Sequence, residues 1–132
     1  MVFPNLYCEK CGKQYENKSC ALYEWCKPCQ INNLRKNFIN WTSGNEKIDK
    51  LIQEMQLKAN SCKDIIFEWI PYDQFDDIKE EIFTEVYFAT WKDGPLSYNK
   101  RENKYTKNQQ NRRVVLKLYN LQNITSESLN EV

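Results

Sequence analysis

Hydrophobic residues in the first half of the chain recur with helical spacing. One set follows Cys29 and predicts a helix: Ile31, Leu34, Phe38 and Trp41. A second set predicts a helix with a single apolar stripe: Ile48, Leu51, Ile52 and Met55. Ser43 and Glu46 have the S-x-x-E spacing of a capping box at the start of this second helix. We expect the stripe to pack against the preceding helix, and a partner-docking face is the alternative.

The second half changes to runs of β-branched and aromatic residues, which predict strands at 65–70, 82–91 and 114–119. Pro71 ends the first strand, and Asp93-Gly94-Pro95 is typical of a turn. The polar, basic stretch 97–113 is expected to form a solvated hairpin insertion, and Thr125 can N-cap a final helix. Helices followed by strands predict an α+β fold.

Composition excludes several classes of protein. The chain has 132 residues, 41% of them hydrophobic, which suits one ordinary domain or a small metal-binding module joined to part of another. A net charge of +1 argues against nucleic-acid binding, and the basic stretch 97–113 alone does not change this. No apolar run predicts a membrane span, and the amino terminus does not resemble a secretory signal. We therefore expect an intracellular, cytoplasmic protein without membrane partners.

The cysteines predict a metal site. Cys8-x2-Cys11 and Cys26-x2-Cys29 can direct four thiolates at one structural zinc ion. Gly12 follows the second cysteine, where a tight turn favours positive φ. The chain contains no histidine, so the site would be all sulfur, and His-dependent nucleophiles are excluded.

Other uses of these thiols compete with zinc binding. Disulfides need an oxidising compartment, and two redox C-x-x-C pairs fit the pattern poorly. Four unrelated free thiols are the remaining alternative. The two further cysteines, Cys20 and Cys62, fall outside the paired spacing and are expected to be spare thiols.

Several motifs in order resemble a large fungal family of protein-kinase-like proteins. The amino-terminal ones are W-C-K-P-C at 25–29 and W-T-S-G-N at 41–45. The others are F-E-W-I-P-Y-D-Q-F-D-D-I-K-E at 67–80, V-Y-F-A-T-W-K-D-G-P-L at 86–96, V-V-L-K at 114–117 and N-I-T-S-E-S-L-N-E-V at 123–132. The resemblance implies that residues 65–132 form part of a kinase N-lobe, an antiparallel sheet followed by the start of helix C.

The resemblance also assigns roles in an ATP pocket. It implies that Lys117 contacts the nucleotide phosphates and that Glu131 of helix C pairs with that lysine. Val86 and Val115 would cover the adenine ring, with Val115 standing where the family has a smaller alanine. ATP and magnesium are thus cofactors implied by the resemblance alone.

The chain departs from the family pattern at the phosphate-binding loop. Residues 78–87, I-K-E-E-I-F-T-E-V-Y, contain no glycine and place three carboxylates where a polyphosphate would lie. No H-R-D, D-F-G or A-P-E motif occurs in the 132 residues, so the catalytic base and the magnesium ligands are missing. We expect the chain to be catalytically inactive.

These observations predict three segments: a zinc-knuckle module at 1–41, a helical connector at 42–64 and a truncated kinase N-lobe at 65–132. The leading hypothesis is a truncated, inactive member of the kinase family. One alternative is a zinc-binding adaptor that recruits a protein partner. The second alternative is the amino-terminal part of an active kinase whose C-lobe is encoded separately.

Overall fold

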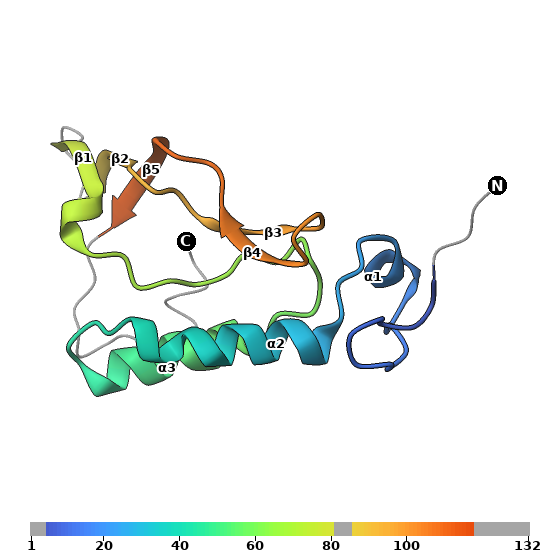
Figure 1. The fold of residues 1–132 in the computed structure, drawn as a ribbon. Coiled ribbons are helices and arrows are strands. Elements are labelled where there is room, and N and C mark those ends of the chain that lie inside the picture. Colours follow the sequence, from blue (N-terminus) through green and yellow to red (C-terminus); the bar gives the residue numbers. More distant parts are fainter. Residues whose placement is uncertain (1–4, 81–85, 118–132) are drawn as a thin grey trace. The chain divides into compact units, whose positions relative to one another are not determined.

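The chain carries its helices in the first half and its antiparallel sheets in the second, an α+β fold (Figure 1). The structure is a computed structural model, and it describes residues 5–80 and 86–117. Two units form. The first contains Met1–Glu68 and Leu96–Thr106, and the second contains Trp69–Pro95 and Lys107–Val132. Residues 96–106 thus belong to the same unit as the amino-terminal half of the chain. The sequence instead predicted three segments that follow one another along the chain.

The helices of the first unit follow the apolar periodicity of the sequence. They are α1 (Lys18–Leu22), α2 (Lys27–Lys36), the 3₁₀-helix η1 (Asn37–Asn40) and α3 (Glu46–Gln56). The helix expected after Cys29 is therefore α-helical to Lys36 and continues as one tighter turn. α2 and α3 lie side by side in Figure 1. Among the described residues, no helix has the length and apolar character needed to cross a membrane.

The start of α3 differs from the predicted capping box. Asn45, not Ser43, is the N-cap, and its Oδ1 accepts hydrogen bonds from the backbone N–H groups of Lys47 (2.9 Å) and Ile48 (3.2 Å). Ser43 instead donates its backbone N–H and its hydroxyl to the Asp49 carboxylate. These bonds stabilise the ionised carboxylate and hold the pKa of Asp49 below its usual range.

The core of the first unit collects side chains from segments far apart in sequence: Cys20, Trp25, Leu34, Ala59 and Ile66. The strand predicted at 65–70 is wrong, because this segment has no regular secondary structure and pairs with no strand among the residues that the structure describes. Its Ile66 side chain is buried in the core, and the Phe67 carbonyl accepts a hydrogen bond from Gln56 Nε2 at 2.6 Å. A side chain thus supplies the hydrogen bond that a neighbouring strand would have supplied.

The predicted hairpin insertion forms, but it is not simply solvated. It consists of β3 (Leu96–Asn99) and β4 (Lys104–Lys107). Tyr98 and Tyr105 stack edge to face, with ring centroids 5.7 Å apart, and both pack against the core of the first unit. The two tyrosines bring apolar area to a stretch that reads as polar, so the hairpin joins that core.

The second unit contains a three-stranded antiparallel sheet in the order β1-β2-β5. β2 (Val86–Trp91) lies within the strand predicted at 82–91, and β5 (Arg112–Lys117) begins two residues before the strand predicted at 114–119. Residues 82–85 and 118–119 of these predictions, and the final helix after Thr125, lie outside the described residues. β1 (Phe75–Glu80) was not predicted. β1 follows the short 3₁₀-helix η2 (Tyr72–Gln74) and carries a bulge at Asp77, whose φ is +51°. The bulge interrupts the alternation by which a strand is recognised in sequence.

Candidate metal centre

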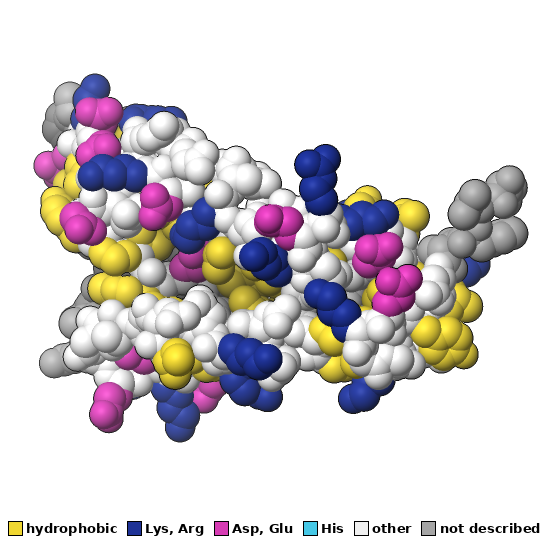
Figure 2. Space-filling view, in the orientation of Figure 1, with side chains coloured by type: hydrophobic (Ala, Val, Ile, Leu, Met, Phe, Trp, Pro, Cys, Tyr) yellow, Lys and Arg dark blue, Asp and Glu magenta, His cyan; other side chains and the backbone are white. Residues whose placement is uncertain are grey.

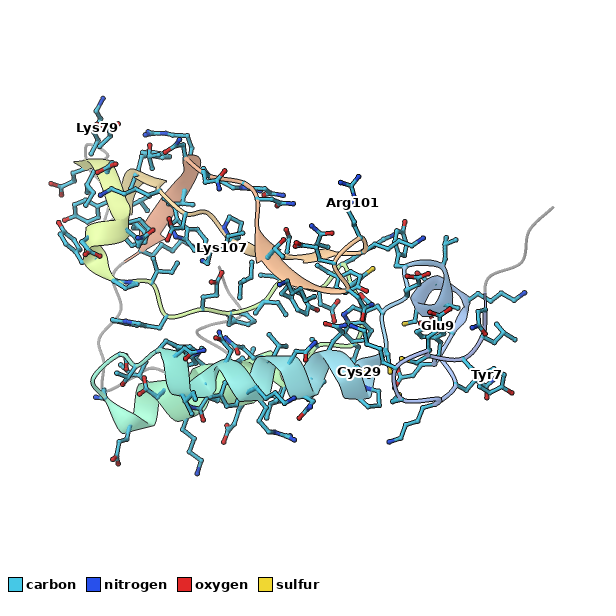
Figure 3. All side chains as sticks on the ribbon, viewed as in Figure 1. Tyr7, Glu9, Cys29, Lys79, Arg101 and Lys107 are labelled. Carbon is cyan, nitrogen blue, oxygen red and sulfur yellow. The ribbon has the colours of Figure 1, made fainter. Side chains whose placement is uncertain are left out.

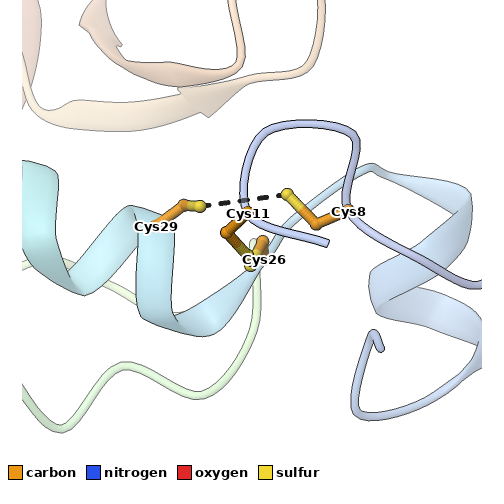
Figure 4. Close-up of side chains that lie close together, drawn as sticks. All are labelled: Cys8, Cys11, Cys26 and Cys29. Atoms are coloured by element: carbon orange, nitrogen blue, oxygen red, sulfur yellow. Dashed lines mark hydrogen bonds between the residues drawn. The ribbon is translucent and has the colours of Figure 1, made fainter. Parts of the chain in front are cut away.

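The first cysteine pair lies in a tight turn. The Gly12 N–H donates to the Cys8 carbonyl at 2.8 Å, and the Cys8 N–H donates to the Lys13 carbonyl, also at 2.8 Å. Gly12 has a φ of +77°, which residues with a Cβ rarely adopt. We call residues 8–12 the first cysteine loop. Both of its sulfurs lie next to sulfurs of the second cysteine pair (Figure 4).

The second cysteine pair begins helix α2. Cys26 is the N-cap residue, Pro28 stands in the first turn, and Cys29 follows it. Backbone N–H groups at a helix start have no partner within the helix, and the helix dipole places partial positive charge there. Both effects stabilise thiolates, the form of cysteine that binds metals. At this pair they oppose the effect of burial, which disfavours the thiolate and is the larger of the two.

The two pairs meet to form one four-sulfur cluster (Figure 4). Cys8 Sγ lies 3.8 Å from Cys29 Sγ, and Cys11 Sγ lies 3.5 Å from Cys26 Sγ. All four sulfurs lie within 4.8 Å of one another. Four sulfurs around a zinc ion at about 2.3 Å would be about 3.8 Å apart, whereas a disulfide needs about 2.05 Å. The spacing fits a tetrahedral metal site, and the four cysteines are free thiols.

Burial makes the cluster electrostatically demanding. Cys8 and Cys26 are buried, Cys29 is half-buried, and Cys11 is exposed. Burial raises the pKa of the Cys26 and Cys29 thiols, because a thiolate there would lose its hydration. A hydrogen bond from the Lys13 backbone lowers the pKa of Cys11 to about 7. A divalent cation at the centre would offset the cost of burying several thiolates together.

The two remaining cysteines lie apart from this cluster. Cys20 is 3% exposed and belongs to the hydrophobic core, against which Cys62 also packs. Burial raises the pKa of both thiols, which keeps them protonated and unreactive. The structure thus separates four clustered cysteines from two in the core, as the spacing in the sequence suggested.

Residues next to the second cysteine pair make contacts that the sequence did not reveal. Trp25 and Gln30 flank the motif and are fully buried. Trp25 Nε1 donates to the Tyr105 hydroxyl at 3.0 Å, and Gln30 Nε2 donates to the Asn103 carbonyl at 3.0 Å. These partners lie 80 and 73 residues away in sequence, and local patterns carry no information about such pairings. The only local signal was Gln30, a polar residue directly after the second cysteine pair, whose side chain needs a hydrogen-bond partner when it is buried.

A groove of about 360 Å³ opens beside the first cysteine loop. Its lining combines that loop, α1 and the turn of the β3–β4 hairpin, and includes Tyr7, Lys10, Leu22, Lys100 and Arg101. Tyr7 and Leu22 are 56% and 54% exposed, so apolar surface borders the groove. In Figure 2, hydrophobic and charged side chains lie next to one another on the surface. Tyr7 and Arg101, two of the residues that line the groove, are labelled in Figure 3.

The residues assigned to an ATP pocket lie in the sheet of the second unit, apart from Glu131, which is outside the described residues. Val86 pairs with Lys117 across β2 and β5, and Phe88 pairs with Val115. Directly paired residues and residues two apart on a strand share a face of the sheet. Val86, Val115 and Lys117 therefore lie on one face, where Val115 is 46% exposed.

Comparison of the chain with protein-family models, curated proteins and solved structures finds no match. By geometry and chemistry the four-cysteine cluster is the strongest candidate site, because two separate segments bring four sulfur ligands to metal-binding distance.

Proposed function

We propose that Cys8, Cys11, Cys26 and Cys29 bind one structural zinc ion. The observation that carries this proposal is the convergence of four sulfurs within 4.8 Å from two separate segments. A zinc ion with four protein ligands has no open position for a substrate, so its role would be structural rather than catalytic. Free thiols at this density also suit a reducing compartment, and we propose that the protein acts inside the cell.

Zinc would supply stability that the surrounding chain lacks. The segment between the cysteine pairs contains a single five-residue helix, α1, which is too short to be stable alone. Metal binding links this segment to the start of α2, and the free energy of binding becomes free energy of folding. Removal of the metal is therefore expected to unfold the first cysteine loop.

We further propose that the zinc-supported unit is an adaptor that recruits a protein partner. The groove beside the first cysteine loop supports this, because exposed Tyr7 and Leu22 border a concave surface. Lys10, Lys100 and Arg101 also line it, and in the described part of the chain none of them forms an ion pair. Two acids, Glu9 and Glu24, share the lining, which would favour a partner segment with both apolar and charged side chains.

Metal analysis of the full chain tests the zinc proposal. Purified protein is expected to contain about one zinc per chain by native mass spectrometry and elemental analysis. Cys26→Ser should lose the metal and melt at a lower temperature, because a hydroxyl is a poor zinc ligand. Cys62→Ala is the matched control and should retain zinc. Zinc-free wild-type protein with the four cysteines in disulfides would overturn the proposal.

A second candidate function concerns the sheet of the second unit. We propose that it derives from a kinase N-lobe and has lost nucleotide binding. The shared face of Val86, Val115 and Lys117 supports the ancestry, since a pocket of that type needs all three on one side. The acidic stretch 78–87 has no glycine to bring backbone N–H groups to phosphates, and its carboxylates would repel ATP.

Calorimetric titration of Mg-ATP into the full chain tests this second proposal. We expect no binding at submillimolar ATP, no change in melting temperature and no phosphoryl transfer to a generic acceptor. Lys117→Ala should behave like the wild type in all three assays. Submillimolar binding that Lys117→Ala abolishes would show that a working pocket exists.

A further inference from the structure

The residues on both sides of the second cysteine pair are held by the β3–β4 hairpin. Before the pair, the Glu24 carbonyl accepts hydrogen bonds from the Tyr98 hydroxyl (2.8 Å) and from Asn103 Nδ2 (2.7 Å). After it, Gln30 Nε2 donates to the Asn103 carbonyl at 3.0 Å. The hairpin thus contacts the chain where it enters the motif and where it leaves.

The burial of these contacts makes them energetically significant. Trp25 and Gln30 are fully buried, so an unmade hydrogen bond at either side chain would not be replaced by water. Trp25 Nε1 finds its partner in the Tyr105 hydroxyl. Without the hairpin, the side chains next to Cys26 and Cys29 would lose these partners together.

The backbone around Glu24 also depends on this support. Glu24 has a φ of +55°, a left-handed conformation that is costly for a residue with a side chain. It lies between α1 and Cys26, and its carbonyl accepts the two hydrogen bonds from the hairpin. The bonds from the hairpin therefore offset local strain two residues before Cys26, a proposed zinc ligand.

We propose that Tyr98, Asn103 and Tyr105 are positioning residues of the cysteine centre, so that zinc binding and docking of the hairpin are one coupled event. The proposal rests on the zinc site proposed above. Outer residues that orient metal ligands raise metal affinity, because the ligands lose less freedom on binding. By reciprocity, bound zinc would order the hairpin as strongly as the hairpin favours zinc.

The coupling would extend along the chain into the second unit. The hairpin is inserted between β2 and β5, which pair over six residues. Its base is closed within the second unit, where Lys107 Nζ donates to the Gly94 carbonyl at 3.0 Å. A hairpin released by zinc loss would become a long flexible connection between the paired strands, which weakens their pairing through loop entropy.

Two kinds of measurement on the full chain test the coupling. Zinc affinity is measured by competition with a chromophoric chelator for the wild type, Tyr105→Phe and Asn103→Gly. Asn103 has a φ of +55°, so glycine keeps the backbone and removes only the side chain. We expect each variant to bind zinc about tenfold more weakly. Hydrogen exchange of residues 96–106 should also rise when zinc is chelated.

Gln56→Met is the matched control for general destabilisation. It removes a buried hydrogen bond of the same first unit, from Gln56 Nε2 to the Phe67 carbonyl, that does not involve the residues flanking the cysteines. It should lower the melting temperature but leave zinc affinity within about twofold. The inference is overturned if wild-type protein binds zinc while both hairpin variants match its affinity, or if Gln56→Met weakens binding equally. Failure of wild-type protein to bind zinc would instead refute the proposed function.

Discussion

Gly94 shows how one residue fixes the base of the β3–β4 hairpin. Its φ is +70°, and a Cβ at this position would overlap the backbone carbonyl of Gln109. Gly44 offers a comparison within the same chain, because its φ is +83° but no atom lies within 4 Å of its would-be Cβ. A substitution at Gly44 would therefore meet only the cost of the positive φ, whereas one at Gly94 would meet that cost and a steric clash.

We predict that Gly94→Ala destabilises the protein by roughly 3 kcal/mol or more, because backbone strain and a backbone clash act together. Gly44→Ala should cost about 1 kcal/mol, from conformation alone. Denaturant unfolding of both variants at constant zinc checks the prediction. Equal losses of stability would show that the close approach at Gly94 relaxes freely.

At the scale of the elements, α3 begins with a hydrogen-bonded arrangement rather than with the predicted capping box. Asn45 caps the helix, and Ser43 bonds to Asp49 in its first turn. A carboxylate in this position also interacts favourably with the helix dipole. Asn45 and Ser43 therefore stabilise the same helix end by different means.

We predict that Asn45→Ala lowers the free energy of unfolding by about 1 kcal/mol, since two backbone N–H groups lose their acceptor. Asn45→Gly should cost only a few tenths of a kcal/mol. Thermal or urea unfolding followed by circular dichroism measures both. A larger loss for Ser43→Ala than for Asn45→Ala would restore serine as the cap.

Sequence patterns predicted elements where the periodicity was local and uninterrupted. The helices around Leu34 and Ile52 and the strands β2 and β5 appear where apolar spacing placed them. The predicted strand at 65–70 does not form: Ile66 is buried in the core, and no strand in the described part of the chain pairs with this segment. β1 escaped detection because its bulge and its polar residues conceal the alternation.

In the molecule as a whole, segments that pack together are not consecutive in the sequence. The first unit takes its core from residues 5–68 and completes it with Leu96–Thr106. The four cysteines were predictable, because ligand type and spacing are local features of the sequence. The supporting residues Tyr98, Asn103 and Tyr105 were not, because their role depends on contacts over more than 70 residues.

We predict that a fragment of residues 1–64 is a poor substitute for the full chain. Without the hairpin, Trp25 would lose its hydrogen-bond partner and part of the packing around it. The fluorescence of Trp25 should shift to longer wavelength, because the side chain becomes more exposed to water. The zinc affinity of the fragment should be about tenfold or more lower than that of the full chain. A fragment that binds zinc as tightly as the full chain would show that the cysteine module is autonomous.

X-ray absorption at the zinc edge of the 132-residue chain shows whether four cysteines hold one zinc ion. We expect four sulfur neighbours at about 2.3 Å from zinc. Cys62→Ala should give the same spectrum. Cys11 is the exposed member of the cluster, so water can replace its sulfur, and zinc added to Cys11→Ser should have three sulfur neighbours and one lighter atom. A wild-type spectrum with fewer than four sulfurs, or with nitrogen or oxygen ligands, would rule out a four-cysteine zinc site.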